Sequence, residues 1–230
     1  MANPLLTLDE FRFEKQYRLF KRFVETTSGL PLASFSSNPY TEEQEGYKYE
    51  VHRKARKALD FGAWKRIDVG SGRIAAAVIA AIELPENNLV QWQARYGLGK
   101  RPHHSLYMAR AERSNLVRYE QVLYDLFRDE ASGEQAFGSL VELFGAKYSL
   151  LAYLFFLKDR TRYMPVAPQY LDAAFKKLGV RFTTSKPALG RTTRSTTLCS
   201  ARYSCVSATG LMATYPFSTP TRSLGCSRQR

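Results

Sequence analysis

Apolar residues recur at helical spacing through most of the chain, and this pattern constrains the fold more than any other feature. The first amphipathic segment shows it, with apolar residues at intervals of three and four: Phe13, Tyr17, Phe20 and Val24. This spacing places them on one face of an α-helix, whereas a half-buried strand alternates every second residue. The sequence has no convincing series of such strands before Val180 and no internal repeat. It therefore predicts an all-α fold.

The same periodicity predicts an irregular bundle of six or seven helices. Their approximate ranges are 7–28, 41–59, 73–83, 111–128, 133–144, 146–157 and 169–178. The segment "DRTRYMPVAP" (159–168) must be extended around its two prolines, because a residue before proline avoids the helical conformation. One short strand or hairpin near Tyr163–Val166 is compatible with this pattern.

Residues 1–180 are expected to form a single helical domain, with a sub-boundary in the Pro- and Ser-rich loop 30–41. Hydrophobic residues make up 44% of the chain and aromatic residues 13%, which excludes a compositionally disordered domain. The longest apolar run, 148–157, is shorter than the roughly 18 residues that span a bilayer. The N-terminus lacks the apolar run of a secretory signal, and residues 1–180 lack cysteine. We therefore expect a cytoplasmic protein with no membrane partner.

Composition changes abruptly after Val180. Eight of the 34 basic residues lie there but none of the 21 acidic residues, so residues 1–180 hold 26 basic and 21 acidic residues, a net charge of +5. The cysteines all lie in this part: Cys199, Cys205 and Cys226. Their spacing matches no zinc pattern, and no metal or cofactor is expected.

The last fifty residues allow two interpretations. A basic arm that binds nucleic acid is one. The other is an out-of-frame reading of GC-rich coding DNA, because Arg, Ser, Thr, Pro, Ala and Cys dominate the composition. Triplets that begin at the third base of each codon permit Trp-Ala-Asn-Tyr over 189–193. Over 216–226 they permit a hydrophobic segment with an acid and aromatic residues, a natural continuation of a helical core. We favour this second interpretation, in which residues 181–230 are a disordered or poorly packed tail rather than a domain.

The stretch "VGSGRI" (69–74) precedes a predicted helix, and glycine backbones at a helix N-terminus can bind a phosphate. It lacks the Gly-Lys-Ser/Thr ending of a P-loop and the third glycine of a dinucleotide fingerprint. A tight turn with Ser71 near the helix cap is the favoured interpretation.

The segment "GLGKRPHHSLY" (97–107) joins bases, histidines and aromatic residues on a loop. Lys100 and Arg101 are candidates for contact with nucleic-acid phosphates. His103 and His104 are adjacent, so on a regular element they point in different directions and poorly suit a shared metal. Either is a candidate catalytic base if the fold brings a carboxylate beside it. A solvated loop remains the third interpretation.

The segment "HRKARKALD" (52–60) concentrates bases near the end of a predicted helix. Arg53, Lys54 and Lys57 are candidate nucleic-acid contacts, and Arg53 and Lys57 share a face at i,i+4. Acidic residues precede them, an order that also suits the helix dipole without any binding role. Further along, "KDR" (158–160) indicates either a partner-binding or active-site corner or an ordinary helix end with a local ion pair.

Two segments carry a resemblance to known proteins: "KYSLLAYLFFLKDRTRYMPVAPQYLDAAFKKLGV" (147–180) and "GSGRI…ENNLVQW" (70–92). With the Trp-x-Asn-Tyr of the shifted frame, they resemble a family of bacterial proteins that occur with HNH-endonuclease or restriction-type modules. The resemblance covers about residues 40–180. It implies a bacterial cytoplasmic protein acting near DNA. The chain contains no HNH ββα-metal pattern, so nuclease activity does not follow.

These observations favour an accessory nucleic-acid-associated domain of a restriction or phage-defence system, with DNA or RNA as its partner. A helical module that binds another protein and has solvated basic residues is the first alternative. A His-dependent, nuclease-like enzyme is the second. The sequence favours a protein without enzymatic activity over an enzyme.

Overall fold

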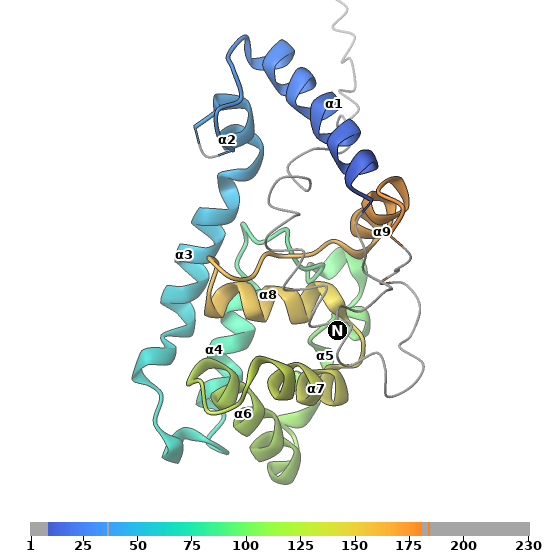
Figure 1. The fold of residues 1–230 in the computed structure, drawn as a ribbon. Helices are drawn as coiled ribbons and strands as arrows, with labels where there is room; N and C mark the ends of the chain where they lie inside the picture. The colour runs from blue at the N-terminus through green and yellow to red at the C-terminus, as the bar shows by residue number, and fades with distance from the viewer. Residues whose placement is uncertain (1–8, 36, 181–183, 185–230) are drawn as a thin grey trace, which may run out of the picture.

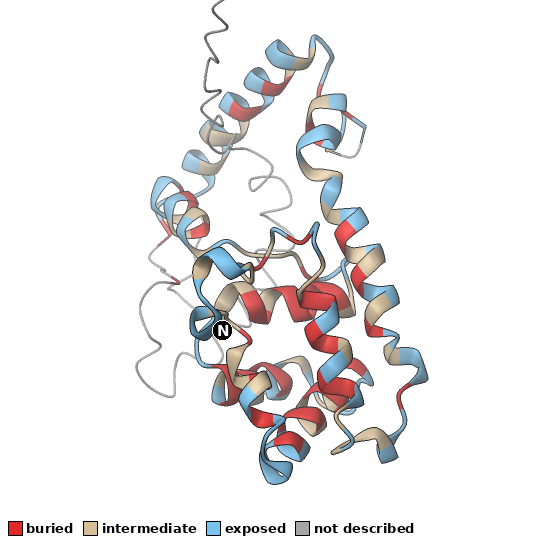
Figure 2. Cartoon of the chain, turned by 180° about the vertical axis from the view of Figure 1, so that it is seen from behind, coloured by how far each residue is buried: buried red, intermediate tan, exposed pale blue. Residues whose placement is uncertain are grey.

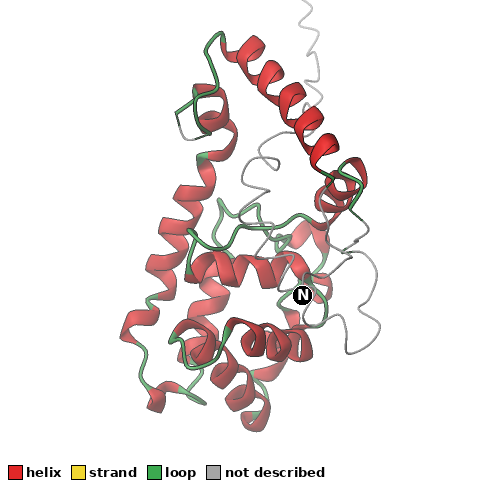
Figure 3. Cartoon of the chain, in the orientation of Figure 1, coloured by secondary structure: helices red, strands yellow, loops and turns green. Residues whose placement is uncertain are grey.

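The computed structural model describes residues 9–35, 37–180 and 184. Within these residues α-helices and short 3-10 turns are joined by loops, and no strand is formed (Figure 3). The all-α prediction is confirmed. The predicted tail 181–230, apart from Thr184, lies outside the described residues, as do the three cysteines.

The helices follow the predicted ranges closely. They are α1 (Glu10–Ser28), α2 (Pro39–Glu45), α3 (Tyr47–Leu59), α4 (Arg73–Ile82), α5 (His104–Ala109), α6 (Arg113–Phe127), α7 (Gly133–Phe144), α8 (Tyr148–Lys158) and α9 (Pro168–Lys177). Four 3-10 turns lie between them: η2 (Phe61–Ala63), η3 (Arg66–Asp68), η4 (Ala94–Tyr96) and η5 (Leu98–Lys100).

Two of these helices go beyond the predicted set. The segment 41–59 divides at Gly46, where an added Cβ would lie 2.5 Å from the carbonyl oxygen of Glu42. Only glycine fits this junction between α2 and α3 without a shift of the backbone. Helix α5 has six residues, too few to show a helical period. The expected short strand is not formed, because residues 163–167 belong to no strand in the described part of the chain.

Helix α8 lies at the centre of the main core (Figure 1). Its sequence is apolar all round, a pattern typical of a helix surrounded by protein. Seven of its side chains are buried: Leu150, Leu151, Tyr153, Leu154, Phe155, Phe156 and Leu157. Helices α3, α4, α6 and α7 supply most of the other core residues, with Leu106 and Ala109 from α5, as the buried positions in Figure 2 show. The hydroxyl of Tyr153 donates to the carbonyl oxygen of Ala81 at 2.8 Å, which ties α8 to the end of α4.

Helix α1 lies outside this core and runs from α2 at one end to α9 at the other (Figure 1). Near α2 it buries Phe20 and Val24 against a small separate cluster. Near α9, Phe13 packs against Leu178 in a second small cluster. Two further apolar residues of α1 are largely exposed, Phe11 at 80% and Leu19 at 56%. Most of the apolar burial therefore lies in residues 51–163.

Candidate functional site

The glycine-rich turn before α4 is filled by a side chain of the protein itself. Glu120 on α6 is fully buried. Its Oε2 accepts hydrogen bonds from the backbone N–H groups of Gly70 at 2.7 Å and Gly72 at 3.1 Å. Its Oε1 accepts from the N–H of Ala75 at 2.8 Å. The phosphate interpretation of "VGSGRI" is wrong for this structure, because an internal carboxylate occupies the donors that a phosphate would need.

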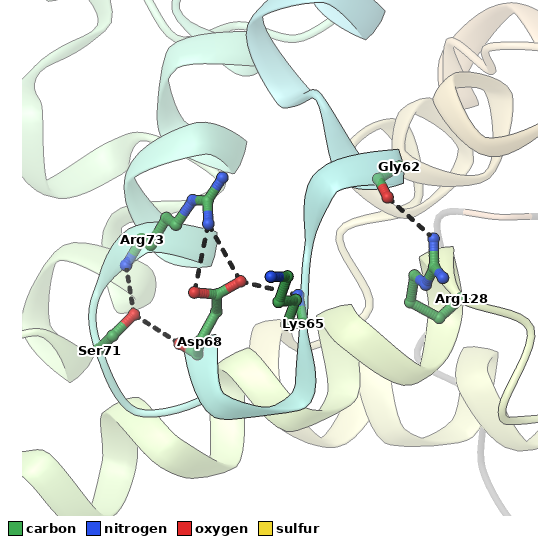
Figure 4. Close-up of polar contacts among 6 residues, drawn as sticks. All are labelled: Gly62, Lys65, Asp68, Ser71, Arg73 and Arg128. Atoms are coloured by element: carbon green, nitrogen blue, oxygen red, sulfur yellow. Dashed lines mark hydrogen bonds and ion pairs between the residues drawn. The ribbon is translucent and has the colours of Figure 1, made fainter.

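The outer side of the same turn is closed by its own polar groups (Figure 4). The carboxylate of Asp68 accepts from the backbone N–H of Lys65 at 2.7 Å and from Nη1 of Arg73 at 3.2 Å. Ser71 Oγ donates to the carbonyl oxygen of Asp68 at 2.5 Å and accepts from the N–H of Arg73 at 3.2 Å. Ser71 thus lies beside the helix start as expected, although Gly72 holds the N-cap position.

The histidine segment folds around a carboxylate that the sequence left unassigned. Glu83 follows the last residue of α4, and its Oε1 accepts from three groups. They are Nη1 of Arg101 at 2.6 Å, the hydroxyl of Tyr107 at 2.8 Å, and Nε2 of His103 at 2.8 Å. We call Glu83, Arg101, His103 and Tyr107 the Glu83 cluster. The carboxylate required beside a catalytic histidine is therefore present.

Burial dominates the electrostatics of the Glu83 cluster. His103 is fully buried, and burial lowers its pKa below the ordinary value, although the hydrogen bond and charge of Glu83 oppose this. The cations Arg101 and Lys147 lower the pKa of His103 further. Burial, followed by Glu83, raises the pKa of Tyr107. His103 is thus a neutral imidazole near neutral pH, held by Glu83 and out of contact with solvent.

His103 and His104 occupy different positions, as their adjacency predicted. His104 is the first residue of α5, is half-buried, and donates its backbone N–H to the carbonyl oxygen of Arg101 at 3.0 Å. The described residues contain no group of three or more histidine, cysteine, aspartate or glutamate side chains placed to hold a metal ion.

The five sequence-predicted nucleic-acid contacts fall into two groups. Three are paired with carboxylates: Arg53 with Glu50 at 2.8 Å, Lys54 with Glu86, and Arg101 with Glu83. Lys57 and Lys100 are exposed, and their ammonium groups form no ion pair with a described residue.

Helix α3 nevertheless presents a continuous basic and aromatic face. Positions 49, 53, 56 and 57 are spaced at intervals of four, three and one residues, which places their side chains on one side of the helix. All four residues are exposed: Tyr49, Arg53, Arg56 and Lys57. Arg160, just beyond α8, places its guanidinium over the Tyr49 ring at 4.8 Å from the centroid. We call these five residues the α3 stripe.

Tertiary contacts hold the α3 stripe in place. Nη1 of Arg56 donates to the carbonyl oxygens of Leu157 at 3.2 Å and Lys158 at 2.8 Å, which satisfies free carbonyls at the end of α8. Its guanidinium also lies 4.3 Å from the centroid of the Phe61 ring. The segment 158–160 is the end of α8 packed against α3, with Lys158 paired to Asp129 at 2.5 Å, which agrees with the interpretation of "KDR" as a helix end with an ion pair. A partner-binding or active-site role of this segment stays a prediction.

His52 lies on the inner side of α3 behind this stripe. Its ring packs edge-on against Phe156 with centroids 5.0 Å apart, and its buried Nε2 has no hydrogen-bond partner. Burial, then the charges of Arg56 and Arg160, lower the pKa of His52 to about 4. No sequence pattern singles out His52, because a single histidine on a helix has no distinguishing spacing.

No described helix combines the length and the apolar character that crossing a membrane requires. Comparison of the chain with protein-family models, with curated proteins and with solved structures finds no match in any of the three sets.

Proposed function

We propose that the protein is a nucleic-acid-associated helical domain that binds a single strand of DNA or RNA along the α3 stripe. The observation that carries this proposal is the stacking of Arg160 over Tyr49, 4.8 Å from the ring centroid. It joins the end of α8 to the exposed face of α3, so aromatic and cationic groups from two parts of the chain form one surface.

This surface has the chemistry that single strands require. Cations track the phosphate backbone, and aromatic rings stack on bases without regard to sequence. Tyr49 is 53% exposed, so a base has access to part of its ring while Arg160 covers another part. Lys57 and Arg160 form no ion pair with a described carboxylate, and Glu50 is the acid paired within the stripe.

Two further points bear on the partner. Lys100 is exposed and is available for a second phosphate contact, whereas Arg101 is engaged by Glu83. The proposal therefore rests on α3 more than on the segment 97–107. The resemblance of residues 40–180 to bacterial proteins with restriction-type modules supports a role beside DNA in a restriction or phage-defence system.

The test is salt-dependent binding of a fluorescent oligothymidylate to the full chain. Replacing Arg53 and Lys57 by glutamine should weaken binding about tenfold and reduce the slope of log Kd against log salt by about 1.4, since each phosphate contact on a single strand contributes about 0.7. Tyr49→Ala should weaken binding about tenfold without a change in slope, because stacking releases no counterions. Tyr49→Phe should retain affinity.

The matched control removes two exposed cations elsewhere, Lys15→Gln on α1 with Lys176→Gln on α9. The basic residues after Val180 are present in every variant, so their contribution cancels. Equal losses in the control and in the α3 variant, or no binding by the unaltered chain at low salt, would rule out a site on α3.

A second candidate function is binding of another protein, favoured by the outer face of α1. Phe11 is 80%, Leu19 56% and Phe23 39% exposed. Leu19 and Phe23 lie four residues apart and share one side of α1, with Phe11 about two turns before Leu19, and Phe23 also packs edge-on against Tyr40. Neighbouring exposed apolar residues commonly mark interaction surfaces. An apolar helix is the complementary partner.

This candidate predicts a complex that survives nuclease treatment. Light scattering and pull-down from the source cell should detect it with the unaltered chain and lose it with Leu19→Glu. Arg18→Glu, at the neighbouring exposed position, should leave the complex intact. Sensitivity of the complex to nuclease would instead assign it to the α3 stripe.

A further inference from the structure

Helix α3 has a second place where an arginine lies over an aromatic ring. The guanidinium of Arg56 lies over the ring of Phe61, with Cζ 4.3 Å from the ring centroid. The Phe61 ring is packed in turn against Phe127, with centroids 5.1 Å apart, and against Trp64 at 6.3 Å. Both of these residues are buried in the main core. The guanidinium of Arg56 therefore rests on a support that the core holds in place.

Hydrogen bonds fix the same guanidinium at its edge. Nη1 of Arg56 donates to the carbonyl oxygens of Leu157 at 3.2 Å and Lys158 at 2.8 Å. The N–H groups of a guanidinium point outward in its plane, so these bonds leave its two faces free. Phe61 covers one face, and because Arg56 is an exposed residue, the opposite face is the accessible one. Nucleic-acid bases stack on guanidinium planes as they do on aromatic rings.

Arg56 lies two helical turns after Tyr49, the exposed ring of the α3 stripe. Seven residues at the α-helical rise place the two positions about 10 Å apart along the axis and on the same side of the helix. Arg53 lies between them, and Lys57 directly follows Arg56. Neighbouring bases of a stacked strand are about 3.4 Å apart along its axis. Tyr49 and Arg56 therefore match the separation of two bases that are three steps apart.

We propose that Tyr49 and Arg56 are two stacking platforms that hold the first and fourth bases of a four-nucleotide single strand, while Arg53 and Lys57 contact its phosphates. This inference rests on the proposed nucleic-acid function and deepens it. It gives the length of strand that the α3 stripe recognises. It also makes the plane of the Arg56 guanidinium, and not its charge alone, a feature that binds.

The test is competition at low salt between a labelled oligothymidylate bound to the full chain and unlabelled thymidylate dinucleotide or tetranucleotide. The unaltered chain should bind the tetranucleotide at least tenfold more tightly than the dinucleotide. Only the longer strand reaches both platforms, and one base stacked on one platform contributes about tenfold in affinity.

Arg56→Lys keeps the positive charge and removes the planar guanidinium. It should weaken binding of the tetranucleotide about tenfold and binding of the dinucleotide by no more than about twofold, because the dinucleotide still has the Tyr49 platform. The slope of log Kd against log salt should stay the same, because the charge is retained. The matched control is Arg53→Lys on the same side of α3. It should leave both affinities within about twofold, because a phosphate contact depends on charge.

Phe61→Leu is the second variant, and it leaves every charge of the α3 stripe in place. It removes the ring that supports the Arg56 guanidinium, so it too should weaken binding of the tetranucleotide more than binding of the dinucleotide. Circular dichroism checks that each variant is folded, and Phe61→Leu keeps the inference testable if Arg56→Lys does not fold.

Failure of this inference differs from failure of the proposed function. No binding of the labelled oligothymidylate, or no effect of Tyr49→Ala on its binding, would overturn the single-strand function itself. Two results would overturn the second platform alone, provided that binding depends on Tyr49. One is an equal loss in Arg56→Lys and Arg53→Lys. The other is a loss in Arg56→Lys that is the same for the dinucleotide and the tetranucleotide.

Discussion

The carboxylate of Glu120 on α6 accepts the backbone N–H of Gly70 at 2.7 Å, although fifty residues separate the two. With Gly72 and Ala75, it closes the start of α4 with a fully buried charge. A carboxylate is stable there because three N–H donors and the positive end of the helix dipole replace its lost hydration. The turn that looks like an anion site is therefore a structural joint between α4 and α6.

Replacing Glu120 by glutamine should lower the free energy of unfolding by about 2–4 kcal/mol. The amide keeps the volume but turns one acceptor into a donor that faces backbone N–H groups. Urea denaturation measures the change. Glu43→Gln, at an exposed position on α2, is the control and should shift stability by less than about 0.5 kcal/mol. A similar shift in both variants would contradict the structural role of Glu120.

Gly70→Ala should destabilise the protein more than Gly72→Ala. Both glycines have φ of +86°, so each substitution strains the backbone by about 1–2 kcal/mol. At Gly70 the new Cβ would also lie 2.8 Å from Cγ2 of Val117, whereas at Gly72 the new Cβ would lie 4.0 Å from its nearest neighbour, Cδ2 of Leu116. Val117→Ala should recover the extra loss at Gly70 and none at Gly72. Thermal unfolding of the three single variants and the two double variants with Val117→Ala tests this coupling, and purely additive effects would refute it.

His52 should make stability fall in mild acid. Its folded pKa is about 4, against about 6.5 when unfolded, because burial disfavours the imidazolium. Between these values the unfolded state binds more protons, so the free energy of unfolding falls as pH drops from about 6.5 to about 4. Arg56 and Arg160 strengthen the effect, and Asp159 opposes it.

His52→Phe should flatten this pH dependence, since phenylalanine keeps the contact with Phe156 and has no proton to bind. Denaturation midpoints measured across the pH window test the prediction. His103, whose pKa is also lowered, should leave a residual slope of the same sign in the variant. An unchanged slope in His52→Phe would assign the acid sensitivity elsewhere.

Glu83→Gln should destabilise the protein by about 2–4 kcal/mol, because it removes the charge that balances the mostly buried Arg101. Tyr107→Phe removes one of the three donors to Glu83 and should cost about 1 kcal/mol. Chemical denaturation measures both. Glu86→Gln is the matched control on the same loop: Glu86 is exposed and forms a surface ion pair with Lys54, so its loss should be small. Equal losses at Glu83 and Glu86 would contradict a cooperative Glu83 cluster.

The helices were predictable because their causes are local. The apolar period of Phe13, Tyr17, Phe20 and Val24 acts within a few turns, and α1 follows it from Glu10 to Ser28. Helix α7 covers 133–144 as predicted, with Ser132 as a cap that accepts from the N–H of Gln135 at 3.3 Å. Periodicity did not predict the junction at Gly46 or the short helix α5. A single junction residue and a six-residue helix are too short to show a full helical period of apolar residues.

The candidate sites were predictable only in part. The segment 97–107 was recognisable from its histidines and bases, but the partner of His103 is Glu83, twenty residues earlier and without a motif of its own. Likewise the face of Arg53 and Lys57 was visible in the helical period, whereas Arg160 reaches Tyr49 only because α8 packs across α3.

The sequence by itself determined the fold class, the helix ranges and the compositional break after Val180, since helical periodicity, glycine and proline act on neighbouring residues. Only the tertiary structure decided which charges have partners. Glu120 occupies the glycine turn, Glu83 engages Arg101 and His103, and Lys57 remains without an acidic partner among the described residues. The pairing of charges depends on distances between helices, and the spacing of residues along the chain does not determine those distances.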